Sequence, residues 1–113
     1  MTLILTHNQI AFLQGLFDRP RGVARSRRDL VAAASPYVIQ LRARGRGIRS
    51  GFSYSCLYKS VRNLPSAWVA RRRVGNRIEF RLLPKGRAVI EGRAGAIRVR
   101  GVGPWVRRSS PRM

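Results

Sequence analysis

Apolar and polar positions follow a helical period most clearly in the second half of the chain. Leu57, Val61 and Leu64 are spaced i, i+4 and i+7, which forms one apolar stripe and predicts a helix over about residues 53–64. Pro65 disfavours the α conformation at the residue before it, so we expect the helix to end near Leu64. The opposite face collects side chains that can donate hydrogen bonds: Ser55, Lys59 and Arg62, with Tyr58 and Asn63 at its edges.

A two-stranded hairpin is predicted directly after this helix, over residues 69–82. Two runs with strand character flank Gly75 and Asn76, a dipeptide typical of a two-residue hairpin turn. This turn places Arg72 opposite Glu79, and an oppositely charged cross-strand pair supports the register. The pairs in that register are Val74 with Arg77, Arg72 with Glu79, and Val69 with Leu82. The tip is rich in arginine, which is poor core material and well suited to phosphate contact.

Helices are also predicted before the hairpin. The two capping boxes of this region are Thr6 with Gln9, and Ser26 with Asp29. The first helix should run to about Phe17, with an apolar face for the core. Residues 26–44 form either one kinked helix or two, because Ser35 and Pro36 can begin a new helix.

Three further segments complete the chain. Residues 84–91 predict a short helix with Gly92 as its stop signal. Residues 96–102 alternate apolar and basic positions, as an edge strand or an extended arm does. Residues 103–113 lack a packing pattern, so we expect a mobile basic tail with Trp105 as an anchor.

The run LYKSVRNL…VARRRVGNRIEFRLLPKGRAVIEG resembles the winged-helix core of PadR-like and MarR-like transcriptional regulators. The matching residues are Leu57-Tyr58, Arg71-Arg72-Arg73, Phe80-Arg81-Leu82 and Pro84-Lys85-Gly86-Arg87. The resemblance covers about a third of the chain and implies a recognition helix followed by an arginine-containing wing. Three residues depart from the family pattern: Pro65 at the helix end, Trp68 where a glycine is usual, and Leu83 where a capping threonine is usual.

The charge of the chain points to a polyanionic partner. Its 113 residues, enough for one domain and one core, carry 24 basic residues against four acids, a formal net charge of +20. A folded domain this small would repel itself strongly without a polyanion. Every basic residue except Lys59 and Lys85 is arginine, which reflects either a GC-rich genome or a chemical preference for bidentate phosphate contacts.

The sequence offers little for catalysis or for a metal. The four acids are scattered and no P-loop, nucleophile elbow or carboxylate pair is present, so we expect no catalytic residues and no enzyme activity. His7 has no companion at ligand spacing and Cys56 is the single cysteine, so no metal, cofactor or disulfide is expected. Redox sensing by Cys56 is an alternative to a buried thiol.

No apolar run approaches the ~18 residues that span a bilayer, and Met1–Leu5 is too short for a signal peptide. We therefore expect no membrane association and a cytoplasmic, nucleoid-associated location, or the host cytoplasm if the protein is viral.

Together these patterns predict an α+β winged helix-turn-helix, with three or four helices and a two-stranded β-hairpin wing. Residues 1–92 would form this domain, and residues 93–113 a basic, partly disordered extension. The expected function is sequence-specific binding to double-stranded DNA in transcriptional regulation, with a homodimer as the expected assembly. The alternatives are a winged-helix RNA-binding or ribosome-associated protein, and a nucleic-acid packaging or virion protein.

The candidate DNA-binding residues come from the predicted helix, the hairpin and a glycine-arginine loop. They are Ser55, Tyr58, Lys59, Arg62 and Asn63; Arg71, Arg72, Arg73, Asn76 and Arg77; and Arg46 and Arg49 of the loop over residues 43–52. Tyr58 either stacks on the nucleic acid or packs at the edge of the core. The loop either contacts the backbone or is a flexible insert.

Overall fold

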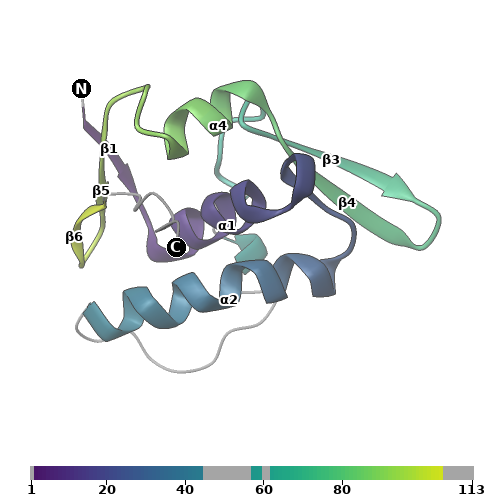
Figure 1. Cartoon of the computed structure of the whole chain (residues 1–113), viewed down its shortest axis with the longest axis horizontal. Coiled ribbons are helices and arrows are strands. Elements are labelled where there is room, and N and C mark those ends of the chain that lie inside the picture. Colours follow the sequence, from purple (N-terminus) through teal and green to yellow (C-terminus); the bar gives the residue numbers. More distant parts are fainter. Residues whose placement is uncertain (1, 45–56, 60–61, 106–113) are drawn as a thin grey trace, which may run out of the picture.

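The computed structural model describes residues 2–44, 57–59 and 62–105, which form helices and two small sheets (Figure 1). The elements in chain order are β1 (Thr2–Leu5), α1 (His7–Asp18), a 3-10 turn η1 (Pro20–Gly22), β2 (Val23–Ala24), α2 (Arg27–Arg44), a helical turn at residues 57–59, β3 (Val69–Val74), β4 (Arg77–Leu82), α4 (Pro84–Ile90), β5 (Ala96–Val99) and β6 (Gly103–Trp105). The predicted α+β class is confirmed. Ser55, Arg46 and Arg49 lie outside the described residues.

Helix α1 is the central element of the core. Its predicted capping box is present: the Thr6 Oγ1 accepts the Gln9 N–H at 3.2 Å, and the Gln9 Oε1 accepts the Thr6 N–H at 2.9 Å. Every residue from Ile10 to Leu16 is buried. Because burial extends around the whole circumference, this helix is covered by other elements on all sides.

Helix α2 resolves the alternative left open by the sequence, because residues 27–44 form one helix with Pro36 inside it. The Ser26 Oγ accepts the Asp29 N–H at 3.1 Å, while a carboxylate oxygen of Asp29 accepts the Arg25 N–H at 3.0 Å. The buried side chains of this helix recur three or four residues apart and face α1: Leu30, Ala34, Val38 and Leu41.

The predicted hairpin and its register are confirmed. Strands β3 and β4 pair antiparallel with Arg72 opposite Glu79, and Gly75 in the turn has a φ of 62°. Strand β2 pairs antiparallel with β4, so the sheet order is β2-β4-β3. Figure 1 shows the hairpin tip projecting away from the helices. The strand β2 was not predicted, and it ties the base of the hairpin to the segment between α1 and α2.

Helix α4 and its stop signal are also confirmed. The Gly92 N–H donates to the Val89 carbonyl at 3.0 Å, and the Arg93 N–H donates to the Ala88 carbonyl at 2.9 Å. These two bonds form a Schellman motif, which needs the left-handed backbone that Gly92 adopts with a φ of 82°. At the other end, Leu83 is the N-cap and provides no side-chain hydrogen bond. Helix α4 therefore begins without a side-chain cap.

The second sheet corrects two predictions for the C-terminal part of the chain. Strand β5 was expected as an edge strand or an arm, but it lies between β1 and β6, parallel to β1 and antiparallel to β6. Residues 103–105 were expected in a mobile tail, but they form β6, and Trp105 is buried. The prediction failed because β1 and β6 are too short to give a recognisable alternation.

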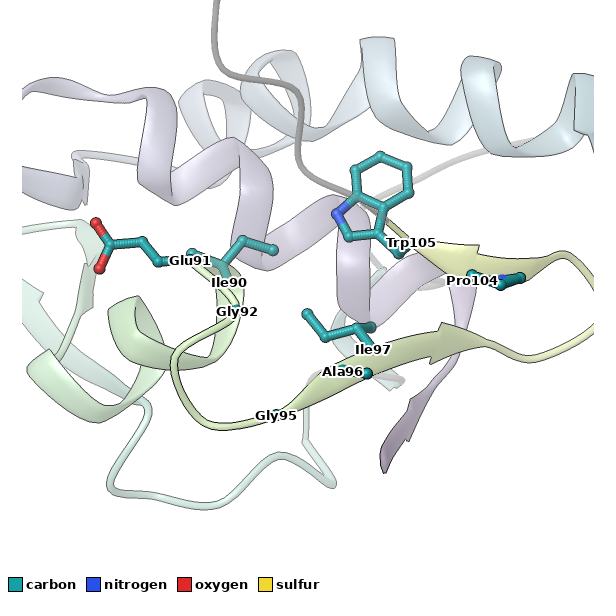
Figure 2. Close-up of a pocket in the computed structure, with 8 residues that line it drawn as sticks. All are labelled: Ile90, Glu91, Gly92, Gly95, Ala96, Ile97, Pro104 and Trp105. Carbon is teal, nitrogen blue, oxygen red and sulfur yellow. The ribbon is translucent and has the colours of Figure 1, made fainter. Parts of the chain in front are cut away.

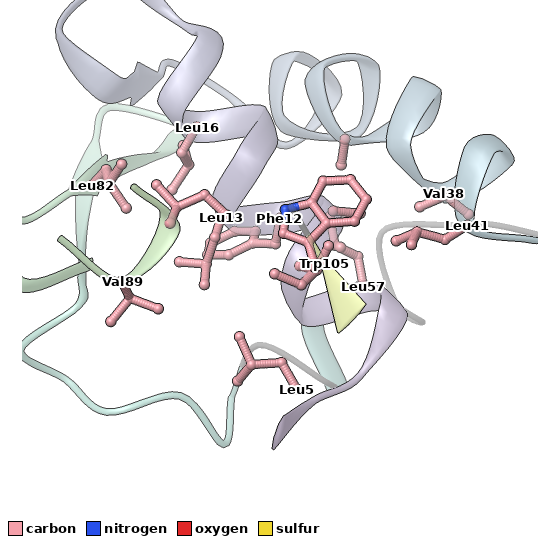
Figure 3. Packing of buried hydrophobic residues seen from close by; sticks show 14 of the residues in the cluster. Leu5, Phe12, Leu13, Leu16, Val38, Leu41, Leu57, Leu82, Val89 and Trp105 are labelled. Carbon is pink, nitrogen blue, oxygen red and sulfur yellow. The ribbon is translucent and has the colours of Figure 1, made fainter. Parts of the chain in front are cut away.

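Both sheets and the helices share one hydrophobic core (Figure 3). The rings of Phe12 and Phe80 meet edge to face at 5.9 Å between centroids, which joins α1 to the hairpin sheet. Trp105 meets Tyr37 in the same way at 6.4 Å, which joins β6 to α2. Leu57 is fully buried in this core, so the helical turn is held against the body of the protein.

Candidate nucleic-acid interface

The helical turn at residues 57–59 separates apolar and basic side chains as predicted. Leu57 faces the core, whereas Lys59 is exposed. The Arg62 N–H donates to the Tyr58 carbonyl at 2.9 Å, a helical hydrogen bond, and the side chains of Arg62 and Asn63 are exposed. The described part of the predicted recognition helix therefore presents Lys59, Arg62 and Asn63 to solvent.

Tyr58 connects this helical turn to the hairpin. The Arg71 guanidinium lies over the Tyr58 ring, 5.2 Å from its centroid, and also donates a hydrogen bond to the phenol oxygen. Tyr58 is half-buried. A cation over an aromatic ring contributes about 0.5–1 kcal/mol at exposed sites, so the contact fixes the hairpin against the helix. The contact joins Tyr58 to the hairpin, and the two roles that the sequence left open for it, stacking on nucleic acid and packing at the edge of the core, both stay predictions.

The arginines of the hairpin divide between its two faces, because paired residues of an antiparallel ladder share a face. The inner face, which packs on the core, carries Val69, Arg71 and Arg73 opposite Leu82, Phe80 and Ile78. The outer face carries Ala70, Arg72 and Val74 opposite Arg81, Glu79 and Arg77. The sequence placed these arginines together at one tip and did not distinguish the faces.

The charges on the outer face are partly compensated. The Arg72 Nη2 lies 3.1 Å from the Glu79 Oε1, and the Arg81 Nη2 lies 3.8 Å from the same oxygen. Within the described chain, no carboxylate lies at ion-pair distance from Arg73 or Arg77. Arg71, which contacts the neutral Tyr58, has no such carboxylate in the described chain either, so the charges of Arg71, Arg73 and Arg77 stay uncompensated by an ion pair.

A small hollow of about 160 Å³ lies where the helical turn meets β3. Its lining residues are Arg62, Leu64, Pro65, Ser66, Val69 and Arg71. Two guanidinium groups and a hydroxyl here can donate hydrogen bonds to one phosphate group. Ser66 was not among the predicted residues. It directly follows Pro65, the predicted end of the helix, and lines the hollow beside Val69 and Arg71.

The departures from the family pattern shape the base of the hairpin. The Trp68 N–H donates to the Pro65 carbonyl at 3.0 Å, which closes a turn after the helix. The Trp68 carbonyl accepts the Leu83 N–H at 2.9 Å, which adds one pair beyond the end of the ladder. Pro65, Trp68 and Leu83 are thus joined by backbone hydrogen bonds, and the hairpin keeps its register.

A different pocket lies on the other side of the molecule from the hairpin tip, between the end of α4 and strands β5 and β6 (Figure 2). It measures about 300 Å³ and is lined mainly by apolar side chains and backbone, including Ile90, Ile97 and Trp105. The carboxylate of Glu91 at its edge pairs with Arg93 at 2.6 Å. This lining does not complement a polyanion, so we do not assign the pocket to the interface.

No group of three or more potential ligands for a metal ion occurs in residues 2–44, 57–59 and 62–105. In the same ranges, no helix combines the length and the apolar character needed to cross a membrane.

No protein-family model, no curated protein and no solved structure matches the chain. The resemblance to PadR-like and MarR-like regulators therefore stays a prediction based on the residues quoted above.

Proposed function

We propose that the protein is a winged helix-turn-helix that binds double-stranded DNA in a sequence-specific manner and regulates transcription. The order of the described elements supports the proposal, since two helices, a helical turn, a β-hairpin and a last helix follow one another in the order the family implies. The short strand β2 between α1 and α2 pairs with β4 and so attaches the hairpin to the helices.

One observation carries the proposal: Arg71 contacts Tyr58, and so joins the exposed face of the helical turn to the arginine-rich hairpin. The resulting helix–hairpin surface consists of Tyr58, Lys59, Arg62, Arg71 and Arg73. A helix and an adjoining hairpin with donors on one continuous surface suit a major groove and its flanking backbone. The net charge of +20 supplies the attraction to a polyanion.

The residues of the helix and of the wing take different roles in this proposal. Lys59 and Arg62 extend from the helical turn, where they can reach base edges. Arg73 and Arg77 extend from the hairpin, where they contact the phosphate backbone and fix the register of the protein on the duplex. The hollow lined by Arg62 and Arg71 would hold one phosphate between the helical turn and the hairpin.

Binding to specific and scrambled duplexes tests these roles, after a preferred site has been selected from random DNA in the presence of an RNA competitor. Lys59→Ala or Arg62→Ala should reduce the free energy of binding to the preferred site by about 1–3 kcal/mol, and that of binding to scrambled DNA by much less. Arg73→Ala or Arg77→Ala should weaken binding to both duplexes equally. Each should also reduce the slope of the logarithm of the binding constant against the logarithm of the salt concentration by about one unit. Arg98→Ala, an exposed arginine of β5, is the control for the loss of one charge.

Equal losses for all four variants on both duplexes would refute sequence reading by the helix and favour a packaging protein. If the protein binds the RNA competitor in preference to DNA, the winged-helix RNA-binding alternative is favoured. A duplex affinity that does not change between dilute and physiological salt would refute an interface built on phosphate contacts.

A further inference from the structure

A second group of arginines lies on the outer face of the β2-β4-β3 sheet. These side chains line a hollow of about 490 Å³, which we name the outer hollow; its lining is Arg19, Pro20, Arg21, Val23, Arg25, Asp29, Glu79 and Arg81. Val23 of β2 pairs with Arg81 of β4, and this pair belongs to the face that does not carry Phe80. The outer hollow therefore opens on the opposite side of the sheet from the Arg71–Tyr58 contact.

The two acids of the outer hollow are already engaged by the protein. Asp29 pairs with Arg19 at 3.1 Å and accepts the Arg25 N–H at 3.0 Å. Glu79 is held between Arg72 and Arg81, as described above. These carboxylates fix the arginines around them and leave an excess of positive charge, since four arginines meet two acids.

Arg21 and Arg25 are the arginines most open to a ligand. Both side chains are exposed, and within the described chain neither guanidinium lies at ion-pair distance from a carboxylate. Arg21 has a φ of 59°, and no other non-glycine residue of the described ranges has a positive φ. A left-handed conformation costs about 1–2 kcal/mol at a residue with a Cβ, and such strain is concentrated at functional sites.

We propose that the outer hollow is a second phosphodiester-binding site, so that one molecule binds two DNA segments and bridges them. This inference rests on the proposed DNA binding by the helix–hairpin surface. Arginine guanidinium groups donate paired hydrogen bonds to phosphate oxygens, which suits a hollow lined by four of them. Arg72 extends the same charge along the outer face of the hairpin.

A single duplex does not satisfy both sites. The two faces of a sheet point in opposite directions, and B-DNA has a persistence length of about 50 nm. Bending a short duplex by 40–90° already costs on the order of 1–6 kcal/mol, and reaching around the hairpin requires a larger turn. A second duplex at the outer hollow avoids this cost.

A bridging experiment with the full chain tests the inference. One duplex is fixed to beads, the protein is added, and capture of a second, labelled duplex is measured beside the affinity for a single duplex. The double variant Arg21→Gln with Arg25→Gln should lower capture at least about tenfold. Its affinity for a single duplex should match that of the control Arg98→Gln with Arg100→Gln, which removes one exposed arginine from β5 and one from the turn that follows it. Arg81→Gln, from β4, should lower capture as well.

The possible outcomes separate the two proposals. Binding of one duplex without capture of a second would overturn the outer site and leave the proposed function intact, whereas binding of no duplex would overturn both. Capture that survives in the Arg21 and Arg25 double variant would mean that two copies bridge through their helix–hairpin surfaces. An equal loss of capture in the control would show that total charge, and not this hollow, is responsible.

Discussion

Replacing Gly86 by alanine should destabilise the protein, because α4 packs directly on the base of the hairpin at this residue. A Cβ on Gly86 would collide with the Trp68 carbonyl oxygen and lie 2.9 Å from the Leu82 Cδ1. The same carbonyl accepts the Leu83 N–H at 2.9 Å, so a shift of the helix also strains that hydrogen bond. Overpacking costs about 1–3 kcal/mol and a lost hydrogen bond about 1 kcal/mol, while alanine recovers about 1 kcal/mol of helix propensity.

The net loss should therefore be about 2 kcal/mol, or roughly 10 °C in the melting temperature of a chain of this size. Urea unfolding followed by circular dichroism measures it, with Lys85→Ala as the control in the same turn. Lys85 is exposed, so its replacement should change the free energy of unfolding by less than about 0.5 kcal/mol. A Gly86→Ala protein as stable as the wild type would refute the close packing of α4 on the residues around Trp68.

Three other substitutions test separate parts of the structure. Thr6→Ala removes the side-chain cap of α1 and should lower the free energy of unfolding in urea by about 1 kcal/mol. An unchanged urea midpoint would show that this hydrogen bond does not stabilise the helix. Trp105→Ala leaves a cavity between β6 and α2 and should lower the free energy of unfolding by about 3–5 kcal/mol. A negligible loss would place this tryptophan outside the core. Glu79→Gln frees Arg72 and Arg81 from their shared carboxylate and should strengthen duplex binding severalfold in dilute salt. That gain in affinity should shrink as salt is added. An affinity that the Glu79→Gln substitution leaves unchanged in dilute salt would argue against a DNA contact on the outer face.

The local features of this fold were readable from the sequence because each depends on residues close together in the chain. Gly75 and Asn76 select a two-residue turn, which sets every cross-strand pair from Val74 with Arg77 to Val69 with Leu82. Thr6 and Gln9 cap α1 within one helical turn, and Gly92 ends α4 through its left-handed backbone. In each case, the residues that form the backbone hydrogen bonds are within a few positions of one another in the chain.

Long-range pairing could not be read in the same way. The strand β1 has four residues and β2 has two, and strands this short have no period that separates them from a loop. The partner of β1 is β5, near the other end of the described chain, and nothing in either segment specifies the other. Trp105 was recognised as an anchor, but its strand was not.

The candidate site was predicted as a set of residue types, and its division into surfaces came from the structure. Arg71 and Arg72 are neighbours in sequence, yet one contacts Tyr58 and the other pairs with Glu79 on the opposite face. The outer hollow was missed because Arg21 and Arg25 lie in a loop that the sequence gave no reason to place beside Arg81.

The parallel pairing of β1 with β5 also has a consequence for how the chain folds. Thr2 pairs with Ala96, so the first strand has no partner until nearly the whole of the described chain is available. Contacts this distant in sequence close late, because the entropy of the intervening loop must be lost before they form. The hairpin and the capped helices depend on residues close together in the chain, so during synthesis all the residues of the arginine-rich hairpin are available while the N-terminal strand still lacks its partner.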